Sequence, residues 1–300
     1  LACAARVLPG GRLTVHFLAA LSPYLTIGAG VASLLPLIAR PSWWIAGPAL
    51  LLALALAVQV PHFFGSGRTP AQSVAIRVLT ANLHEGSADP KALAALARER
   101  TDLLVVQELT PQAAEGLSRH GLDSELPYRA VDARPGAAGV GMWSRYPILR
   151  SSRAPGYQLG VIIASLRIPD VTSDAVVLAT HLAGPWPQPI DGWRKELANL
   201  PGTMRTAAEA AGAGAVIVAG DLNATADMAP FRRLLEGGFS NAADQAGAGL
   251  ARTYPADGSV PPLIGIDHIL TFNSAASSLQ TVRIPGSDHL GVIATIHVPT

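Results

Sequence analysis

The chain has 300 residues, of which only 14% are charged, with a formal net charge of +1 and a mean hydropathy of +0.32. Its single cysteine, Cys3, excludes an intramolecular disulfide and a cysteine-based zinc site. Residues 1–70 hold four arginines and no acidic residue. The totals of 22 basic and 21 acidic residues therefore leave 18 and 21 after position 70, a net charge of −3. That balance lacks the excess of positive charge by which proteins bind long nucleic acid through its phosphates.

Two long uncharged runs lie near the start of the chain. No Asp, Glu, Lys or Arg occurs in residues 13–39 or in residues 41–67, and each run exceeds the roughly 20 residues that cross the hydrocarbon core of a bilayer. We predict a membrane region over residues 1–64, with about two transmembrane helices near residues 13–39 and 43–60 that contact the lipid bilayer. Two buried core helices are the alternative, but the runs are apolar on all faces.

A polar, glycine-containing stretch, residues 65–76, is typical of a flexible linker. The remaining residues 77–300 have the size of one globular domain. Arginines lie before, between and after the two apolar runs, so the distribution of positive charge does not fix the topology. The richness in Ala, Arg, Gly and Pro, with Lys91 and Lys195 as the only lysines, indicates a bacterial genome of high GC content.

Short apolar runs of strand type repeatedly end in polar residues. The clearest run, residues 216–219, leads into Gly220-Asp221-Leu222-Asn223, where Asp221 and Asn223 share one face of an extended chain. A turn or a helix cap explains any single pair of this kind. Six such places are harder to explain as six separate turns, and their polar residues are Asn82, Glu108, His181, Asp221 with Asn223, Asp267, and Asp288 with His289.

Two segments between these runs are predicted helices. Residues 89–100 form an amphipathic pattern in which Asp89 suits the N-cap and Pro90 the first helical position. Residues 193–211 indicate a second helix, which we expect to be interrupted at Pro201-Gly202. Strands and helices in this order support a mixed α/β fold, and the pattern alone specifies no more than that.

The order of these polar residues resembles the endonuclease/exonuclease/phosphatase superfamily of metal-dependent phosphoesterases. The resemblance spans roughly residues 76 to 298, and its most specific parts are Gly220-Asp221-Leu222-Asn223 and Ser287-Asp288-His289. It implies an α/β fold in the form of a two-sheet sandwich with outer helices, as in deoxyribonuclease- and sphingomyelinase-like members. Together with the two apolar runs and the composition, the resemblance predicts a bacterial, membrane-anchored member in which the transmembrane helices precede the sandwich.

The resemblance assigns a role to each polar residue. Glu108 and Asp288, together with Asn82, match the metal-binding group, for which the expected cofactor is Mg²⁺ with Mn²⁺ as a substitute. His181 and Asn223 match residues that contact the phosphate and take part in catalysis. Asp267 matches the residue that orients the final histidine, as a carboxylate fixes a catalytic imidazole. Asp221 and His289 complete the catalytic set, and which of them handles the proton of the attacking water stays open.

The predicted function is divalent-metal-dependent hydrolysis of phosphate esters by an endonuclease-type phosphodiesterase tethered to the membrane. One alternative is a phosphodiesterase or phosphatase of lipid head groups, so the expected partner is a phosphate ester of nucleic acid or of a lipid. A non-catalytic, membrane-tethered binding module is the alternative of another class. We expect a multi-pass protein of the bacterial cell membrane with its catalytic domain outside the cytoplasm, and no feature indicates a protein partner.

Overall fold

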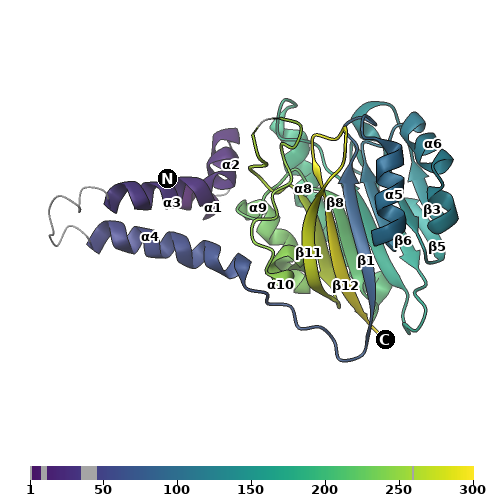
Figure 1. Cartoon of the computed structure of the whole chain (residues 1–300). Helices are drawn as coiled ribbons and strands as arrows, with labels where there is room; N and C mark the ends of the chain where they lie inside the picture. The colour runs from purple at the N-terminus through teal and green to yellow at the C-terminus, as the bar shows by residue number, and fades with distance from the viewer. Residues whose placement is uncertain (1, 8–11, 35–45, 259) are drawn as a thin grey trace.

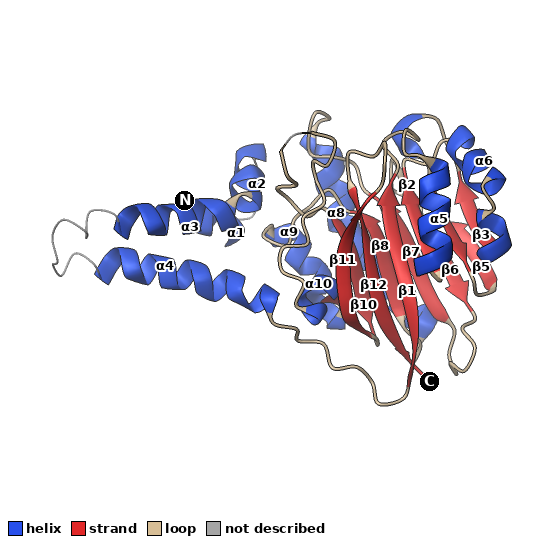
Figure 2. Ribbon diagram, viewed as in Figure 1, coloured by secondary structure: helices blue, strands red, loops and turns tan. Residues whose placement is uncertain are grey.

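A computed structural model describes residues 2–7, 12–34, 46–258 and 260–300. Two six-stranded sheets pack face to face, and helices cover their outer faces (Figures 1 and 2). The first sheet has the order β11 (Ala275–Arg283), β12 (Leu290–Pro299), β1 (Ser73–Asn82), β2 (Leu103–Gln107), β4 (Val140–Ser144), β3 (Tyr128–Asp132). The second has the order β5 (Ile148–Arg153), β6 (Gly160–Leu166), β7 (Ala175–His181), β8 (Val216–Asp221), β10 (Asp267–Phe272), β9 (Ser240–Asn241). The predicted two-sheet sandwich with outer helices is confirmed.

Each sheet is built around one parallel pair of strands. β1 and β2 run parallel in the first sheet, and β7 and β8 run parallel in the second, whereas the other neighbours are antiparallel. Strands buried on both faces read as continuous apolar runs. On β8, Ile217 points into the core between the sheets, while Val216 and Val218 point outward under a helix. Parallel pairs bring the carboxyl ends of their strands to the same edge, which is where the polar residues follow.

The outer helices pack on apolar stripes. The first sheet carries α5 (Pro90–Arg100), α6 (Pro111–Arg119) and α7 (Leu122–Glu125), and the second carries α8 (Ile190–Ala211), α9 (Ala229–Arg232) and η5 (Arg233–Gly238); α10 (Ala242–Ala246) follows β9. The helix predicted over residues 89–100 is confirmed, since Asp89 caps it by accepting a hydrogen bond from the Lys91 N–H at 2.9 Å.

The prediction of an interruption at Pro201-Gly202 is wrong, because α8 runs continuously through Pro201. Proline removes one hydrogen bond of the helix. The buried stripe continues on both sides of it, through Leu197 and Leu200 before it and Met204 after it. Burial of that stripe against the second sheet outweighs the missing bond.

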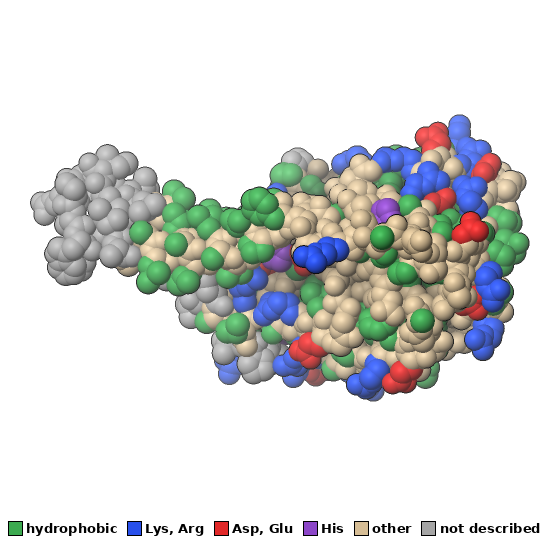
Figure 3. All heavy atoms as spheres, turned by 90° about the horizontal axis from the view of Figure 1, so that it is seen from below, with side chains coloured by type: hydrophobic (Ala, Val, Ile, Leu, Met, Phe, Trp, Pro, Cys, Tyr) green, Lys and Arg blue, Asp and Glu red, His purple; other side chains and the backbone are tan. Residues whose placement is uncertain are grey.

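Before the sandwich, the chain forms α1 (Ala2–Val7), α2 (Leu13–Ala20), α3 (Ser22–Leu34), α4 (Ala46–Gln59) and the short η3 (Val60–Phe63). Helices α3 and α4 lie side by side and project from the sandwich as an arm (Figure 1). Gly30 permits their close approach, since a Cβ there would lie 2.7 Å from the Leu52 side chain. Figure 3 shows hydrophobic side chains along this arm, and Val31, Leu50 and Leu54 are each more than half exposed.

Within the described ranges, no single helix is both long and apolar enough to cross a membrane. The segments Leu13–Ala20 and Ser22–Ala32 reach that length and hydropathy only together, and they are bent by 65° at the break between them. The prediction of about two transmembrane helices is therefore not confirmed. Residues 35–45, which include parts of both predicted spans, lie outside the described residues.

The boundary between linker and domain differs slightly from the sequence expectation. β1 begins at Ser73, where it pairs with Pro299 of β12, so the last four residues of the predicted linker 65–76 already belong to a strand. The linker itself contacts the sandwich, because the Ser66 N–H donates to the Asp244 carbonyl and the Gly67 N–H to the Gln245 carbonyl.

Candidate active site

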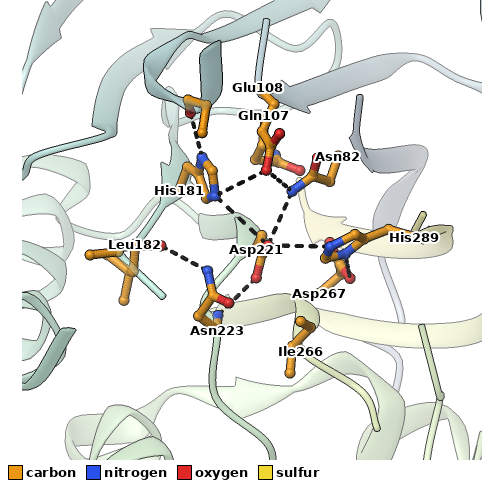
Figure 4. A network of polar contacts seen from close by, with 12 residues as sticks. Asn82, Gln107, Glu108, His181, Leu182, Asp221, Asn223, Ile266, Asp267 and His289 are labelled. Carbon is orange, nitrogen blue, oxygen red and sulfur yellow. Dashed lines mark hydrogen bonds and ion pairs between the residues drawn. The ribbon is translucent and has the colours of Figure 1, made fainter. Parts of the chain in front are cut away.

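The predicted polar residues meet at one edge of the two sheets (Figure 4). Asn82 ends β1, Glu108 follows β2, and His181 and Asp221 end β7 and β8. In the second sheet, His181 pairs with Asp221 across β7 and β8, and Asp221 pairs with Asp267 across β8 and β10. These three residues therefore form one row across neighbouring strands, and His289, which precedes β12, lies next to Asp267 (Figure 4).

Asn82 joins the two sheets at this edge. Its amide nitrogen donates to Glu108 Oε1 at 3.0 Å and to Asp221 Oδ2 at 3.2 Å. Its amide oxygen accepts the His84 N–H at 2.9 Å. The oxygen that Asn82 would offer to a cation is thus already hydrogen-bonded within the protein, and the nitrogen holds two carboxylates together.

The turn after β1 positions Glu108. His84, Glu85 and Gly86 have φ of 48°, 50° and 79°, and Glu108 itself has φ of 56°. Left-handed backbone at a non-glycine residue costs on the order of 1 kcal/mol, and such residues concentrate at functional sites. This turn directs the Glu85 N–H to Glu108 Oε2 at 2.6 Å. Glu108 is therefore held by one donor on each of its carboxylate oxygens.

His181 is almost fully buried and has one defined orientation. Its Nδ1 lies 3.0 Å from the Ala137 carbonyl, to which it donates, so Nε2 faces the cluster. That Nε2 lies 4.0 Å from Glu108 Oε1 and 3.8 Å from Asp221 Oδ2. Burial lowers the pKa of His181 below its usual range, because a charged ring is poorly solvated there.

His289 and Asp267 form a buried ion pair. His289 Nδ1 lies 2.8 Å from Asp267 Oδ2, and His289 Nε2 lies 3.9 Å from Asp221 Oδ2. Burial works against the charged ring, but Asp267 and the other carboxylates outweigh it and raise the pKa of His289 to about 10. Burial also disfavours the Asp267 carboxylate, yet His289 lowers the pKa of Asp267 below its usual value. The raised pKa favours the imidazolium form of His289, in which Nε2 is a donor.

Asp221, unlike Asp267, has a pKa above the usual value of a carboxyl group. Burial, together with the nearby Asp267 carboxylate, raises the pKa of Asp221 to about 8. Its Oδ1 accepts the Asn223 N–H at 2.8 Å, and Asn223 Nδ2 donates to the Leu182 carbonyl at 2.9 Å. An unusual carboxyl pKa in a polar cluster is a frequent mark of a catalytic site.

Asp288 lies at the rim of the cluster. Its Oδ1 is 3.8 Å from His84 Nδ1, and burial raises the pKa of its carboxyl group. The negative charge of Glu108 adds a smaller contribution to that rise. Carboxylates such as these are the donor type that a hard divalent cation prefers.

The cluster has donor atoms suited to a metal ion. Asp221 and Asp267 each bring a carboxylate oxygen within 4.8 Å of the other and of a ring nitrogen of His289, and all three residues are buried. The carboxylates are the candidate ligands, because a protonated imidazole has no lone pair to offer a metal. Asp267 Oδ1 is buried and has no hydrogen-bond partner within the part of the chain that is described. The raised pKa values of Asp221 and Asp288, and the unpaired oxygen of Asp267, belong to carboxyl groups that a nearby cation would stabilise in their charged form. The residues present therefore fit a divalent metal.

Sequence reasoning gave no role to three residues that the structure places at the site. The Tyr254 ring lies on His289 with 4.9 Å between ring centroids, and burial followed by the nearby Asp288 carboxylate raises the pKa of its phenol. Thr253 Oγ1 accepts the Asp267 N–H at 3.4 Å. Ser287 Oγ donates to the Asn82 carbonyl at 2.7 Å. For Thr253 and Tyr254, the sequence signal was the stretch Thr253-Tyr254-Pro255, which precedes β10 and β12, the strands next to Asp267 and His289.

Comparison with known proteins agrees with this geometry. The sequence profile of the Endonuclease/Exonuclease/phosphatase family matches residues 79–289. No curated protein gives a significant sequence match. Among solved structures, a humanized TDP2 from D. rerio has a TM-score of 0.61 at 17% identity, covering 74% of this chain and 98% of that one.

Two further structures show the same sandwich. D. rerio TDP2 complexed with a single-strand DNA product has a TM-score of 0.58 at 19% identity, covering 74% of this chain and 98% of that chain. An endonuclease/exonuclease/phosphatase from Bacteroides vulgatus has a TM-score of 0.57 at 16% identity, with 74% and 98% covered. Structural similarity at such low identity establishes the fold alone. The profile match covers most of the sandwich, and it shows that this chain belongs to the Endonuclease/Exonuclease/phosphatase family.

Proposed function

We propose that the protein is a divalent-metal-dependent phosphodiesterase of the endonuclease type, tethered to a membrane. The observation that carries this proposal is the convergence of Glu108, His181, Asp221 and the Asp267–His289 pair at one edge of the sandwich. Members of this family are typically metal-dependent hydrolases of phosphate esters, and the cluster contains both the acidic and the donor groups that such a reaction requires.

Glu108 and Asp288 would hold Mg²⁺ or Mn²⁺, with Asn82 fixing the position of Glu108. When bound, the cation would supply positive charge that polarises a phosphoryl oxygen. His181, whose Nε2 lies 4.0 Å from Glu108 Oε1, and Asn223, whose backbone N–H donates to Asp221, would bind the phosphate. Both are fixed by hydrogen bonds to backbone carbonyls, so little reorganisation accompanies binding.

We assign the proton transfers to Asp221, at the end of β8, and to the Asp267–His289 pair beside it. His289 carries a proton on Nε2 near pH 7 because Asp267 holds its other nitrogen, so His289 would donate to a phosphate oxygen. Asp221 lies within 4 Å of both His289 Nε2 and His181 Nε2. A neighbouring cation lowers a carboxyl pKa, and Asp221 would then be the carboxylate that orients the attacking water.

Membrane tethering is part of the proposal. The arm formed by α3 and α4 contains no charged residue within its described part, and it exposes large apolar side chains at Leu25, Val31, Leu50 and Leu54. Monomeric soluble proteins rarely expose extended apolar surface. We place the arm in a bacterial cell membrane and the sandwich on its extracytoplasmic side.

The same arm supports a second candidate, hydrolysis of a phosphodiester in a lipid head group. A catalytic domain held at a bilayer meets lipid phosphate at high local concentration. The net charge of −3 after residue 70 disfavours binding of long nucleic acid through its phosphates. The two candidates share the reaction and differ in the substrate.

A substrate panel with the full chain in detergent or in lipid nanodiscs tests both. Plasmid DNA, RNA, a phospholipid panel and bis-p-nitrophenyl phosphate would each be incubated with Mg²⁺ or with EDTA, and Asp221→Ala would be the control. Metal-dependent nicking of DNA that the variant lacks supports the endonuclease. Turnover of lipid and of the small diester with intact DNA supports the lipid candidate. Absence of hydrolysis of every substrate contradicts both and favours a non-catalytic binding module.

A further inference from the structure

The helices that precede the sandwich meet it at one buried carboxylate, Asp227. The Asp227 side chain accepts hydrogen bonds at Oδ1 from Ser22 of α3 at 3.4 Å and from Gln59 at the end of α4 at 3.2 Å. Arg6 of α1 forms an ion pair with the same oxygen. Asp227 is only 6% exposed, and a buried carboxylate is costly unless it is paired and hydrogen-bonded. Three separate N-terminal helices thus supply its partners.

Arg232 of α9 completes this junction from the side of the sandwich. Its guanidinium donates to the Asp227 carbonyl at 2.7 Å and to the Ala226 carbonyl at 3.3 Å. It also donates to the carbonyl of Arg6. The backbone around Asp227 and the backbone of α1 are therefore held by one side chain.

Asp227 lies near the end of the loop of residues 222–228, which directly follows the catalytic Asp221. The loop leaves β8 directly after Asp221 and includes Asn223. It is largely buried, with Leu222, Ala224 and Thr225 each less than 5% exposed. The Leu222 N–H donates to the Ile266 carbonyl at 3.0 Å. Because packed interiors transmit displacement, a shift at Asp227 would be passed along this short loop to Asp221.

The same loop also contacts the strand of Asp267. His268 Nε2 lies 2.8 Å from the Ala224 carbonyl, and the His268 ring lies 4.3 Å from the Phe231 ring, centroid to centroid. His268 is the next residue after Asp267. The loop of residues 222–228 therefore lies between the N-terminal helices on one side and both catalytic carboxylates on the other.

We propose that Asp227 is a positioning residue of the active site, and that the N-terminal helices support the catalytic loop by holding its carboxylate. On this view α1, α3 and α4 do more than tether the sandwich: they fix one end of the segment that carries Asp221 and Asn223. The proposal rests on the proposed function only for its kinetic readout. Its structural readout, the rigidity of residues 222–228, is independent of any substrate.

The test compares Asp227→Ala, Asp227→Asn and a matched control, His62→Ala, in the full chain in detergent. His62 Nδ1 bonds to Asp244 of α10 at 2.6 Å, so its loss weakens a contact of the N-terminal region with the sandwich that does not involve the Asp227 carboxylate. Hydrolysis of bis-p-nitrophenyl phosphate is the kinetic readout, because a small soluble diester needs no membrane contact. Hydrogen–deuterium exchange of residues 222–228 is the structural readout, and thermal unfolding identifies any variant that fails to fold.

For Asp227→Ala we expect kcat to fall by about 10- to 100-fold, the range that a small displacement of catalytic groups produces, with a much smaller change in KM. Exchange in residues 222–228 should become faster. Asp227→Asn, which keeps the shape but not the charge, should be intermediate, and His62→Ala should keep the wild-type kcat.

Two results would overturn the proposal. One is a folded Asp227→Ala variant with wild-type kcat and wild-type exchange. The other is an equal loss in His62→Ala, which would make the effect one of general docking. If the wild-type chain hydrolyses no phosphate ester, the proposed function fails, and exchange in residues 222–228 alone decides whether Asp227 positions the loop.

Discussion

At the scale of single residues, Glu108 is the side chain whose role in metal binding is most directly measurable. Glu108→Gln keeps its size but removes the charge that a divalent cation requires. We expect the affinity for Mg²⁺ to fall at least about ten-fold, as measured by isothermal titration calorimetry. The matched control is Glu85→Gln, because Glu85 is exposed and contributes its backbone N–H, which the substitution keeps. Equal affinities in the Glu108→Gln variant and in the wild type would remove Glu108 from the metal site.

Asp267 determines the charge and orientation of His289. Asp267→Asn removes the negative partner of Nδ1, so the pKa of His289 should fall from about 10. The preferred tautomer should change as well, because an amide can donate where a carboxylate can only accept. We expect kcat to fall by about 10²- to 10⁴-fold, by analogy with the loss of a carboxylate behind a catalytic histidine.

A pH–rate profile and NMR titration of the histidines check this prediction. Asp257→Asn serves as the control, since Asp257 is exposed. An unchanged titration of His289 in the Asp267→Asn variant would show that burial and the remaining carboxylates, not Asp267, govern the ring.

At the scale of elements, α8 contains a proline in its interior that the fold tolerates. Pro201 has no N–H to donate to the preceding turn, while the buried stripe of Leu197, Leu200 and Met204 holds the helix on both sides. We expect Pro201→Ala to increase the free energy of unfolding by up to about 3 kcal/mol. Urea denaturation measures it.

Pro230→Ala is the matched control for that measurement. Pro230 lies in the first turn of α9, where the N–H of a helix has no partner in any case. We expect little change there. A loss of stability in Pro201→Ala would mean that the proline ring itself packs in a way that the alanine cannot replace.

The sequence predicted those helices and strands that are determined by neighbouring residues in the chain. The sequence predicted the N-cap at Asp89 from its local pattern. It also predicted the apolar runs that end at Asn82, His181 and Asp221, because side chains alternate along a strand and polar residues at strand ends can meet at one edge of a sheet. The continuity of α8 did not follow, because tertiary burial overrode the local effect of Pro201. The junction at Asp227 could not be predicted either, since Arg6 and Asp227 are far apart in the sequence and no local pattern pairs them.

At the scale of the whole molecule, one buried acid joins strands of the first sheet. Asp102 accepts hydrogen bonds from Arg77 on β1 at 2.8 Å and from Arg145, which follows β4, at 3.2 Å. Burial opposes its charge, but the Arg77 hydrogen bonds outweigh this and lower the pKa of Asp102. A lowered folded-state pKa adds stability above the unfolded pKa of about 4, which is lost as the pH falls through the folded value.

Asp102→Asn should therefore destabilise the protein at pH 6 by more than it does at pH 3. Urea unfolding of both proteins at the two pH values measures the difference. A penalty that is the same at both pH values would show that hydrogen-bond shape, and not charge, accounts for the contribution of Asp102.

For the whole molecule, we propose that the one cluster at the edge of the sandwich catalyses metal-dependent hydrolysis of a phosphodiester. The most direct measurement is hydrolysis of bis-p-nitrophenyl phosphate by the full chain, with Mg²⁺ or with EDTA. Asp221→Ala and His289→Ala are the test variants, and Glu115→Ala on the exposed face of α6 is the control. We predict Mg²⁺-dependent hydrolysis that the control keeps and that both test variants lose while remaining folded. Hydrolysis retained in both folded test variants, or unaffected by EDTA, would contradict the account.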